Sequence, residues 1–222
     1  PAAFQGVWEK HVVLKSDWEI NRDDYAHFVA TCQERVDSLL ARLEAATGLS
    51  REELLQQSIV MTGFTFARHV QLFGADYLHT YFFYDQSFMG LMAGWLLEIP
   101  RGITAYADHM LNDYQFKLVP LQIELADVVV ATSARIKTEL SALSGGRFDD
   151  KIIVKPNGVN TARFPYVPAA TRLADEGEPE LVSVSRIEPK KGLIHLIEAV
   201  ALLQQRGVRV RVNIIGGVDP HT

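Results

Sequence analysis

The sequence predicts an α/β chain built on doubly wound parallel sheets. From about residue 77 onward, short apolar runs alternate with helical segments, and this alternation is typical of parallel βαβ units. A polar stretch containing Pro and Gly interrupts the alternation at 168–179, after which a strand, a helix and a strand follow again. Of the 222 residues, 48% are hydrophobic and 22% are charged, as in chains that bury a core. We therefore expect two domains, the second of them incomplete.

The first 74 residues are expected to be mainly helical. Apolar residues recur every three or four positions over 22–46, and Gly48 is placed to end that helix. Ser50 and Glu53 have the spacing of a capping box, which predicts the start of a second helix. A third helix is expected over about 65–73, ending at Gly74.

The following residues predict the first sheet and the start of a second. Strands are expected at 77–83, 102–106, 127–132 and 151–154, with helices at 86–97, 111–126 and 133–143 between them. Pro120 should disturb the second of these helices, because proline lacks the backbone N–H that a helix interior needs. After the linker we expect a strand at 181–185, a helix at 192–206 and a strand at 208–215. The predicted domains are therefore 1–167, a linker at 168–179, and a truncated domain at 180–222.

Composition and charge exclude several classes of protein. The net charge is -5, and the basic residues form no cluster of the kind that nucleic-acid-binding domains show. The single cysteine, Cys32, cannot form an internal disulfide, so we expect a reducing compartment and a cytoplasmic protein. The longest apolar run, 88–99, is too short to span a bilayer and predicts a buried helix. No Cys or His motif with metal-site spacing is present, so no metal site is expected.

The loop from Ser185 to Gly192 carries the clearest chemical signal. It joins an expected strand to an expected helix at the carboxyl edge of a parallel sheet, where ligands of such folds bind. Arg186, Lys190 and Lys191 bring positive charge to a helix N-terminus, which disfavours cations and favours anions. A bound phosphate or diphosphate would explain the arrangement. On local sequence alone, a solvated basic turn explains it equally well.

Side chains able to exchange protons or hydrogen bonds follow two strands of the first sheet. His79 lies in the first strand, and Tyr106, Asp108 and His109 lie at or just after the end of the second, so all are at or near carboxyl ends of expected strands. Together they would supply donors, acceptors and a titratable base at one edge of the sheet. A histidine in an apolar strand is more often a hydrogen-bonded core residue, so His79 alone does not indicate catalysis.

A third candidate is the segment that follows the fourth strand. It contains Asn157 and Gly158, a pair typical of tight turns, followed by Asn160. The frequency of such turns favours a purely structural role.

Five segments, taken in order and spacing, resemble the glycosyltransferases of family 4. This is a large retaining group of GT-B architecture, in which two Rossmann-like domains face a cleft. The resemblance extends from about residue 74 to 217. The matching segments are L-H-T-Y-F at 78–82, the stretch from Ile99-Pro100 to Tyr106-Ala107, A-D-V-V-V-A-T-S at 126–133, N-G-V-N at 157–160, and V-S-V-S-R-I-E-P-K-K-G at 182–192.

The resemblance implies a retaining transferase of the hexosyltransferase type. Such an enzyme moves a sugar from a nucleotide-diphosphate-sugar donor to a polysaccharide, lipid-linked or small-molecule acceptor. It implies that 1–167 is the acceptor side, that the donor domain begins at 180, and that Arg186 and Lys191, with Lys190 beside them, contact the donor diphosphate. No cofactor and no metal ion are implied. A lipid-linked acceptor would bring the enzyme to a membrane surface, but no basic amphipathic helix supports that contact.

The sequence departs from the family pattern at two matched positions. Tyr106 stands where the family has its cleft histidine, and Asn160 stands where it has an aspartate. Asp108 or His109 would then take over part of the histidine's role. The family's first strand with its Gly-rich loop is not recognisable before residue 74, and its paired glutamates would fall beyond Thr222. We therefore expect the 222-residue chain alone to be inactive.

Two alternatives remain open. A nucleotide-sugar epimerase of the same architecture would convert the donor without any acceptor. A non-catalytic binding module would lack the paired glutamates. A dinucleotide-dependent dehydrogenase is disfavoured, because no G-x-G-x-x-G follows an expected strand.

Overall fold

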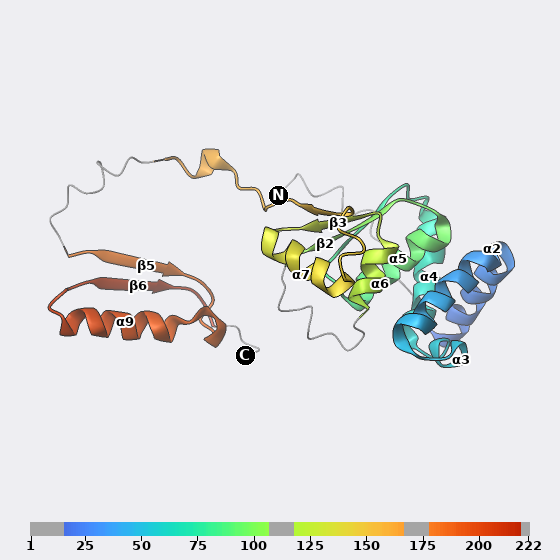
Figure 1. Cartoon of the computed structure of the whole chain (residues 1–222), viewed down its shortest axis with the longest axis horizontal. Helices are drawn as coiled ribbons and strands as arrows, with labels where there is room; N and C mark the ends of the chain where they lie inside the picture. Colours follow the sequence, from blue (N-terminus) through green and yellow to red (C-terminus); the bar gives the residue numbers. More distant parts are fainter. Residues whose placement is uncertain (1–15, 107–117, 167–177, 219–222) are drawn as a thin grey trace. The chain divides into compact units, whose positions relative to one another are not determined.

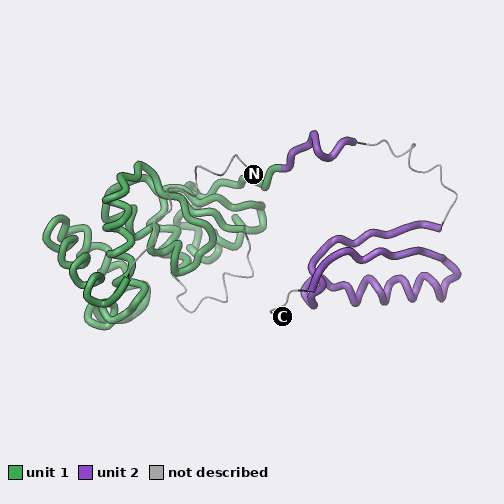
Figure 2. The backbone as a smooth tube through the Cα atoms, turned by 180° about the vertical axis from the view of Figure 1, so that it is seen from behind, with its two compact units in different colours: residues 1–158 green, residues 159–222 purple. Residues whose placement is uncertain are grey.

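The computed structural model describes residues 16–106, 118–166 and 178–218. The chain divides into two compact units, 1–158 and 159–222 (Figure 2), and each is described by itself. Most of the predicted linker at 168–179 lies outside the described residues. The functional division into an acceptor-side and a donor-side domain stays a prediction.

The first unit begins with helices, as the sequence predicts. The capping box is confirmed: the Ser50 side chain accepts a hydrogen bond from the Glu53 N–H, and the Glu53 carboxylate accepts one from the Ser50 N–H at 2.8 Å. Gly48 ends the first helix in the left-handed region at φ 73°. Cys32 interrupts that helix with non-helical dihedral angles, φ -153° and ψ 52°. The helices are α2 (Trp18–Thr47), α3 (Arg51–Leu54) and α4 (Ser58–Phe73), so α4 starts earlier than predicted.

A four-stranded parallel sheet follows in the same unit (Figure 1). The strands are hydrogen-bonded in the order β1-β2-β3-β4, which is also their order in the sequence. Because the strands are parallel, their carboxyl ends meet at one edge of the sheet. The elements are β1 (Leu78–Tyr81), α5 (Asp85–Leu97), β2 (Arg101–Ala105), α6 (Val119–Leu125), β3 (Val128–Ala131), α7 (Ala134–Ser144) and β4 (Ile152–Val154).

Two local expectations were wrong. Pro120 does not disturb α6, because it lies in the first turn of that helix, where no intrahelical N–H bond is needed. Residues 107–117, which include the predicted start of this helix, lie outside the described residues. The first strand ends at Tyr81 rather than at 83, because Phe82 adopts a left-handed backbone with φ 63°.

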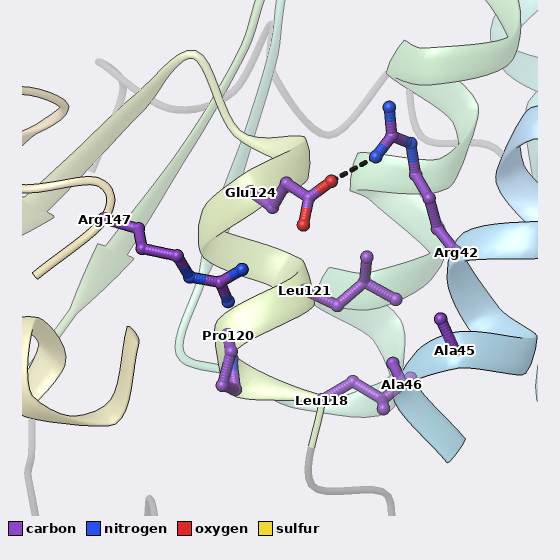
Figure 3. Close-up of a pocket in the computed structure, with 8 residues that line it drawn as sticks. All are labelled: Arg42, Ala45, Ala46, Leu118, Pro120, Leu121, Glu124 and Arg147. Atoms are coloured by element: carbon purple, nitrogen blue, oxygen red, sulfur yellow. Dashed lines mark hydrogen bonds and ion pairs between the residues drawn. The ribbon is translucent and has the colours of Figure 1, made fainter. Parts of the chain in front are cut away.

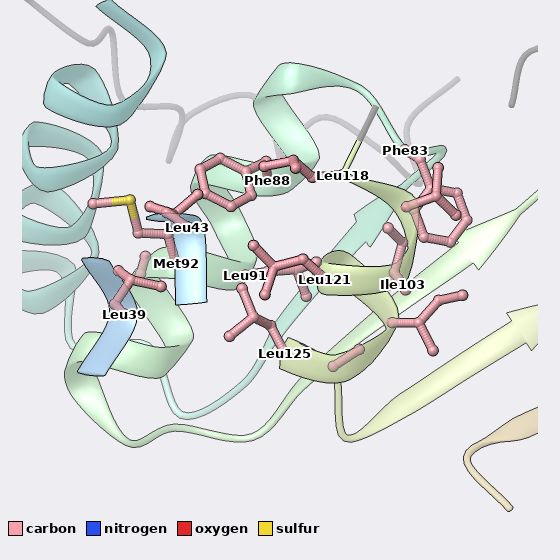
Figure 4. Packing of buried hydrophobic residues seen from close by; sticks show 14 of the residues in the cluster. Leu39, Leu43, Phe83, Phe88, Leu91, Met92, Ile103, Leu118, Leu121 and Leu125 are labelled. Carbon is pink, nitrogen blue, oxygen red and sulfur yellow. The ribbon is translucent and has the colours of Figure 1, made fainter. Parts of the chain in front are cut away.

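The core lies between the sheet and the helices that cover one of its faces. Leucines of α2 and α6 gather around α5 in one cluster (Figure 4). Within α5, Phe88 and Leu91 are fully buried, so the apolar run at 88–99 forms a buried helix as predicted. Across the described ranges, no helix combines the length and the apolar character needed to cross a membrane.

One close approach fixes which face of β1 the helix α5 covers. A Cβ at Gly90 of α5 would lie 2.4 Å from the Cγ2 atom of Thr80, so only glycine fits there. Thr80 therefore points toward α5. Because side chains alternate along a strand, His79 and Tyr81 point to the opposite face of the sheet.

The second unit contains one parallel strand pair and one helix. β5 pairs with β6 in register from Glu180 with Arg211 to Val184 with Ile215. The predicted strand, helix and strand are all present, although β6 starts three residues later than expected. The elements are η3 (Thr161–Arg163), β5 (Glu180–Val184), η4 (Pro189–Lys191), α9 (Leu193–Gln205) and β6 (Arg211–Ile215).

Packing around α5 leads to a first prediction. Leu91→Ala should lower the free energy of unfolding by about 2–5 kcal/mol, since it removes buried methyl groups and leaves a cavity. The matched control is Leu72→Ala, at a leucine of α4 whose residue surface is 69% exposed, and it should cost less than about 0.5 kcal/mol. Urea unfolding of both variants measures the difference. Equal losses would show that Leu91 does not support the core.

Candidate functional site

A pocket opens at the carboxyl edge of the four-stranded sheet. Its volume is about 340 Å³, and it brings together four of the residues predicted from the sequence: His79, Tyr106, Asn157 and Gly158. The other lining residues are Tyr81, Thr104, Val130, Thr132, Lys155 and Pro156. The structure thus gathers predicted residues from β1, from the end of β2 and from the segment after β4. Their roles in catalysis or binding stay a prediction.

His79 is held in place by two hydroxyl groups. Its Nδ1 atom lies 2.9 Å from the Tyr77 hydroxyl, and its Nε2 atom lies 2.7 Å from the Thr104 hydroxyl. Because a hydroxyl can donate or accept, either neutral tautomer of the imidazole satisfies both bonds. Burial lowers the pKa of His79 below its ordinary value, because the charged ring would lose hydration. His79 therefore presents a neutral ring that orders its neighbours.

Gly102 makes this arrangement of side chains possible. It pairs directly with His79 across the β1–β2 ladder. A Cβ at Gly102 would lie 2.6 Å from the Tyr77 hydroxyl and 2.8 Å from the His79 Nδ1 atom. The space that a side chain would fill at this position is occupied by the Tyr77–His79 hydrogen bond.

Tyr106 lies directly after β2, among other rings. It is stacked with Tyr81 at a centroid distance of 5.9 Å, and Phe82 lies 5.5 Å from it at a tilt. Tyr106 has 41% of its surface exposed, so the phenol can reach a ligand in the pocket. Asp108 and His109, the other predicted groups after β2, lie outside the described residues.

The segment after β4 forms one wall of the pocket. The Lys155 N–H donates to the Ala131 carbonyl at 2.9 Å, which extends the β3–β4 pairing by one residue and brings Asn157 to the pocket edge. Lys155, the first residue of this candidate segment, supplies a cation that was not among the predicted site residues. Asn160 belongs to the second unit, where its side chain accepts from the Ala162 N–H at 3.1 Å and so caps the short helix η3.

The predicted cationic loop follows β5 in the second unit. Pro189, Lys190 and Lys191 form a short 3-10 turn, and Gly192 in the left-handed region (φ 64°) leads from it into α9. Arg186 and Lys190 are about half exposed. The cations therefore precede the N-terminus of α9, at the carboxyl end of the strand, as the sequence predicts.

Glu188 in this loop and Gly216, which approaches the loop from the end of β6, were not among the predicted site residues. The Glu188 side chain is buried, with 5% of its surface exposed, and its Oε1 atom lies 3.2 Å from Arg186 Nη2 and 3.6 Å from Lys190 Nζ. Gly216, after β6, has no room for a side chain, because a Cβ would lie 1.8 Å from the Ser185 carbonyl oxygen. An acidic residue between basic ones could have signalled an ion pair. No local sequence pattern indicates that Gly216 lies against the backbone of Ser185.

A second pocket of the first unit, about 320 Å³, lies between α2 and α6 (Figure 3). Arg42 forms an ion pair there with Glu124 and lies 4.9 Å from the Trp95 ring centroid. Arg147 lines the pocket from the other side of α6. The Arg42–Glu124 pair links α2 to α6, and none of the predicted site residues lies in this pocket. In the part of the chain that the structure describes, no cluster of His, Cys, Asp or Glu could hold a metal ion.

Comparison with known proteins finds one curated relative over part of the chain. No family model matches the chain. The chain is 31% identical over 131 residues to the putative colanic acid biosynthesis glycosyltransferase WcaL of Escherichia coli (strain K12). This match covers 58% of the chain but only 30% of WcaL.

Among solved structures, the chain resembles Anabaena Alr3699/HepE. The crystal structure of that protein in complex with UDP and glucose has a TM-score of 0.51 at 20% identity, covering 71% of this chain and 44% of HepE. The complex with UDP-glucose has a TM-score of 0.47 at 18% identity, covering 70% and 52%. At this identity the first likeness shows the fold, and the predicted α/β fold class is confirmed. How the two units face each other stays a prediction.

The environment of His79 leads to a prediction about pH. Because burial lowers the folded-state pKa, the unfolded chain takes up the proton first as the pH falls. The free energy of unfolding should therefore fall as the pH drops below about 6.5, the ordinary histidine value, and level off below the folded-state pKa. The His79→Gln variant should lack this contribution, so its free energy of unfolding should vary less with pH than that of the wild type.

Urea unfolding between pH 8 and pH 5 measures this effect. Leu72→Ala, a change at an exposed residue of the same unit that removes no titratable group, is the control and should keep the wild-type pH dependence. An unchanged pH dependence in His79→Gln would contradict the described environment of the ring.

Proposed function

We propose that this chain is part of a retaining glycosyltransferase that moves a hexose from a nucleotide-diphosphate sugar to an acceptor. The observation that carries the proposal is the 131-residue similarity to WcaL, a protein named as a glycosyltransferase. The likeness to HepE, crystallised with UDP and glucose, supports a UDP-sugar as the donor. The acceptor would be a polysaccharide, a lipid-linked glycan or a small molecule.

In this proposal the loop after β5 binds the donor diphosphate. Negative charge builds up on the leaving diphosphate as its bond to the sugar breaks. Fixed cations at that position stabilise the transition state more than the ground state, which accelerates the reaction. Arg186 and Lys191 would contact the diphosphate, with Lys190 beside them. These side chains would neutralise the charge without a metal ion.

In this proposal the pocket at the edge of the four-stranded sheet binds the acceptor. Its polar groups are hydroxyls, an amide and an imidazole, which suit the hydroxyl groups of a sugar. Tyr106 would hydrogen-bond a sugar hydroxyl in place of the family's histidine. Asn157 and Lys155 supply a neutral and a charged donor on the opposite wall of the pocket.

Binding of UDP to the 222-residue chain tests the donor site. Arg186→Ala should weaken UDP binding at least tenfold, because it removes a cation from the diphosphate site. The matched control is Arg209→Ala, which removes an exposed arginine just before β6, at the opposite edge of the parallel pair. It should leave UDP affinity within twofold of wild type. Isothermal titration calorimetry measures both.

Three outcomes would count against the proposal. UDP could fail to bind the wild-type chain, or Arg186→Ala and Arg209→Ala could weaken binding equally. Incubation of UDP-glucose with the chain and no acceptor should give no product. The third contrary outcome is the formation of an epimerised sugar nucleotide in this incubation, which would favour the epimerase instead.

A further inference from the structure

Four rings form a continuous row at the edge strand of the four-stranded sheet. His79 and Tyr81 lie at alternate positions of β1 and so share a face, and Tyr77, just before the strand, is hydrogen-bonded to His79. Their neighbouring ring centroids are 5.9 Å and 5.1 Å apart, and Tyr106 continues the row 5.9 Å beyond Tyr81. We call these four residues the aromatic ladder.

The aromatic ladder keeps much of its surface in contact with solvent. Tyr77 is 50% exposed, Tyr81 is 52% exposed and Tyr106 is 41% exposed. Three large rings that touch their neighbours and still face solvent form a continuous exposed aromatic surface. Surfaces of this kind mark interaction sites more often than scattered single rings do.

The four side chains of the aromatic ladder carry polar groups but no formal charge. Each tyrosine carries a hydroxyl, and His79 is held neutral between Tyr77 and Thr104. A ligand that fits must therefore offer flat apolar faces and uncharged hydrogen-bonding groups at regular intervals. A pyranose ring has this character, because its C–H face packs on an aromatic ring while its hydroxyls project at the rim.

The aromatic ladder leads into the pocket described above. His79, Tyr81 and Tyr106 belong to both, and Lys155 and Asn157 lie on the far wall of the pocket. A chain of sugars lying along β1 would therefore place its terminal residue among the hydroxyl, amide and ammonium groups of the pocket.

We propose that the aromatic ladder binds a linear, uncharged oligosaccharide along β1 and directs its terminal sugar into the pocket. The acceptor would then be an extended glycan rather than a small molecule, an assignment that rests on the proposed function. Glycan binding itself does not depend on that function. A single-stranded nucleic acid fits less well, because none of the four ladder side chains supplies a cation for its phosphates. A peptide strand would use the backbone edge of β1 rather than the ring faces.

Calorimetry with the 222-residue chain tests the proposal. The probes are linear hexasaccharides of glucose, galactose and mannose, each compared with its monosaccharide. At least one hexasaccharide should bind at least tenfold more tightly than the monosaccharide, because several rings engage several sugars. Tyr81→Ala should weaken that binding at least tenfold, and Tyr81→Phe should weaken it less because the ring remains.

Tyr166→Ala is the matched control, since Tyr166 is an 83% exposed tyrosine outside the aromatic ladder. It should leave hexasaccharide affinity unchanged. Urea unfolding establishes that Tyr81→Ala remains folded. Failure of every hexasaccharide to bind, or equal binding by wild type and Tyr81→Ala, would overturn the proposal. If Tyr81→Ala unfolds, Tyr77→Ala replaces it in the same comparison, and hexasaccharide binding by that variant equal to wild type would also overturn the proposal.

UDP titrations separate this inference from the proposed function. Tyr81→Ala should bind UDP as the wild type does. Hexasaccharide binding without UDP binding would leave a glycan-binding surface and reject the transferase. UDP binding without hexasaccharide binding would support the transferase and reject the aromatic ladder as its acceptor site.

Discussion

The candidate site depends on the absence of a side chain at Gly102. This absence leaves room for the groups around His79. Parallel pairing sets Gly102 opposite His79, and the Tyr77–His79 hydrogen bond lies where a methyl group would otherwise be. His79 in turn reaches Thr104, two residues further along β2. One backbone register therefore fixes an imidazole and two hydroxyls at once. Any larger residue at Gly102 would displace these side chains, because its Cβ would lie 2.6 Å from the Tyr77 hydroxyl and 2.8 Å from the His79 Nδ1 atom.

A second close approach constrains the opposite face of the sheet, where β1 packs on α5. Thr80 approaches α5 so closely that only a glycine, Gly90, fits beneath it. Because successive side chains of a strand point to opposite faces, Tyr81 and His79 point away from α5. The aromatic ladder is thus a consequence of how tightly α5 packs on β1. The packing of Thr80 on α5 and the placement of His79 and Tyr81 on the other face both follow from the four-residue strand β1.

Much of the fold could be predicted because it depends on local patterns. Alternating apolar runs gave the strands, and the Ser50–Glu53 spacing identified a helix start. The meeting of His79 and Asn157 was predictable, since carboxyl ends of parallel strands share an edge. The roles of Gly102 and Gly216 could not be predicted from the sequence. Close approaches at these glycines depend on which strands pair and in what register. Pro120 was misjudged because its effect depends on whether it lies in the first turn or the interior.

The charge arrangement after β5 explains how a loop can be basic and still ordered before any anion binds. Glu188 is buried, whereas the two cations that it holds, Arg186 and Lys190, are about half exposed. Because an unpaired buried carboxylate is costly, the cations would stay against Glu188 and meet a ligand with the parts of their side chains that solvent reaches. The carboxylate stays fixed, and with Lys191 included the loop keeps a net positive charge. Glu188 would therefore hold the cations near the diphosphate position without neutralising them, which is what an electrostatic site prepared in advance requires.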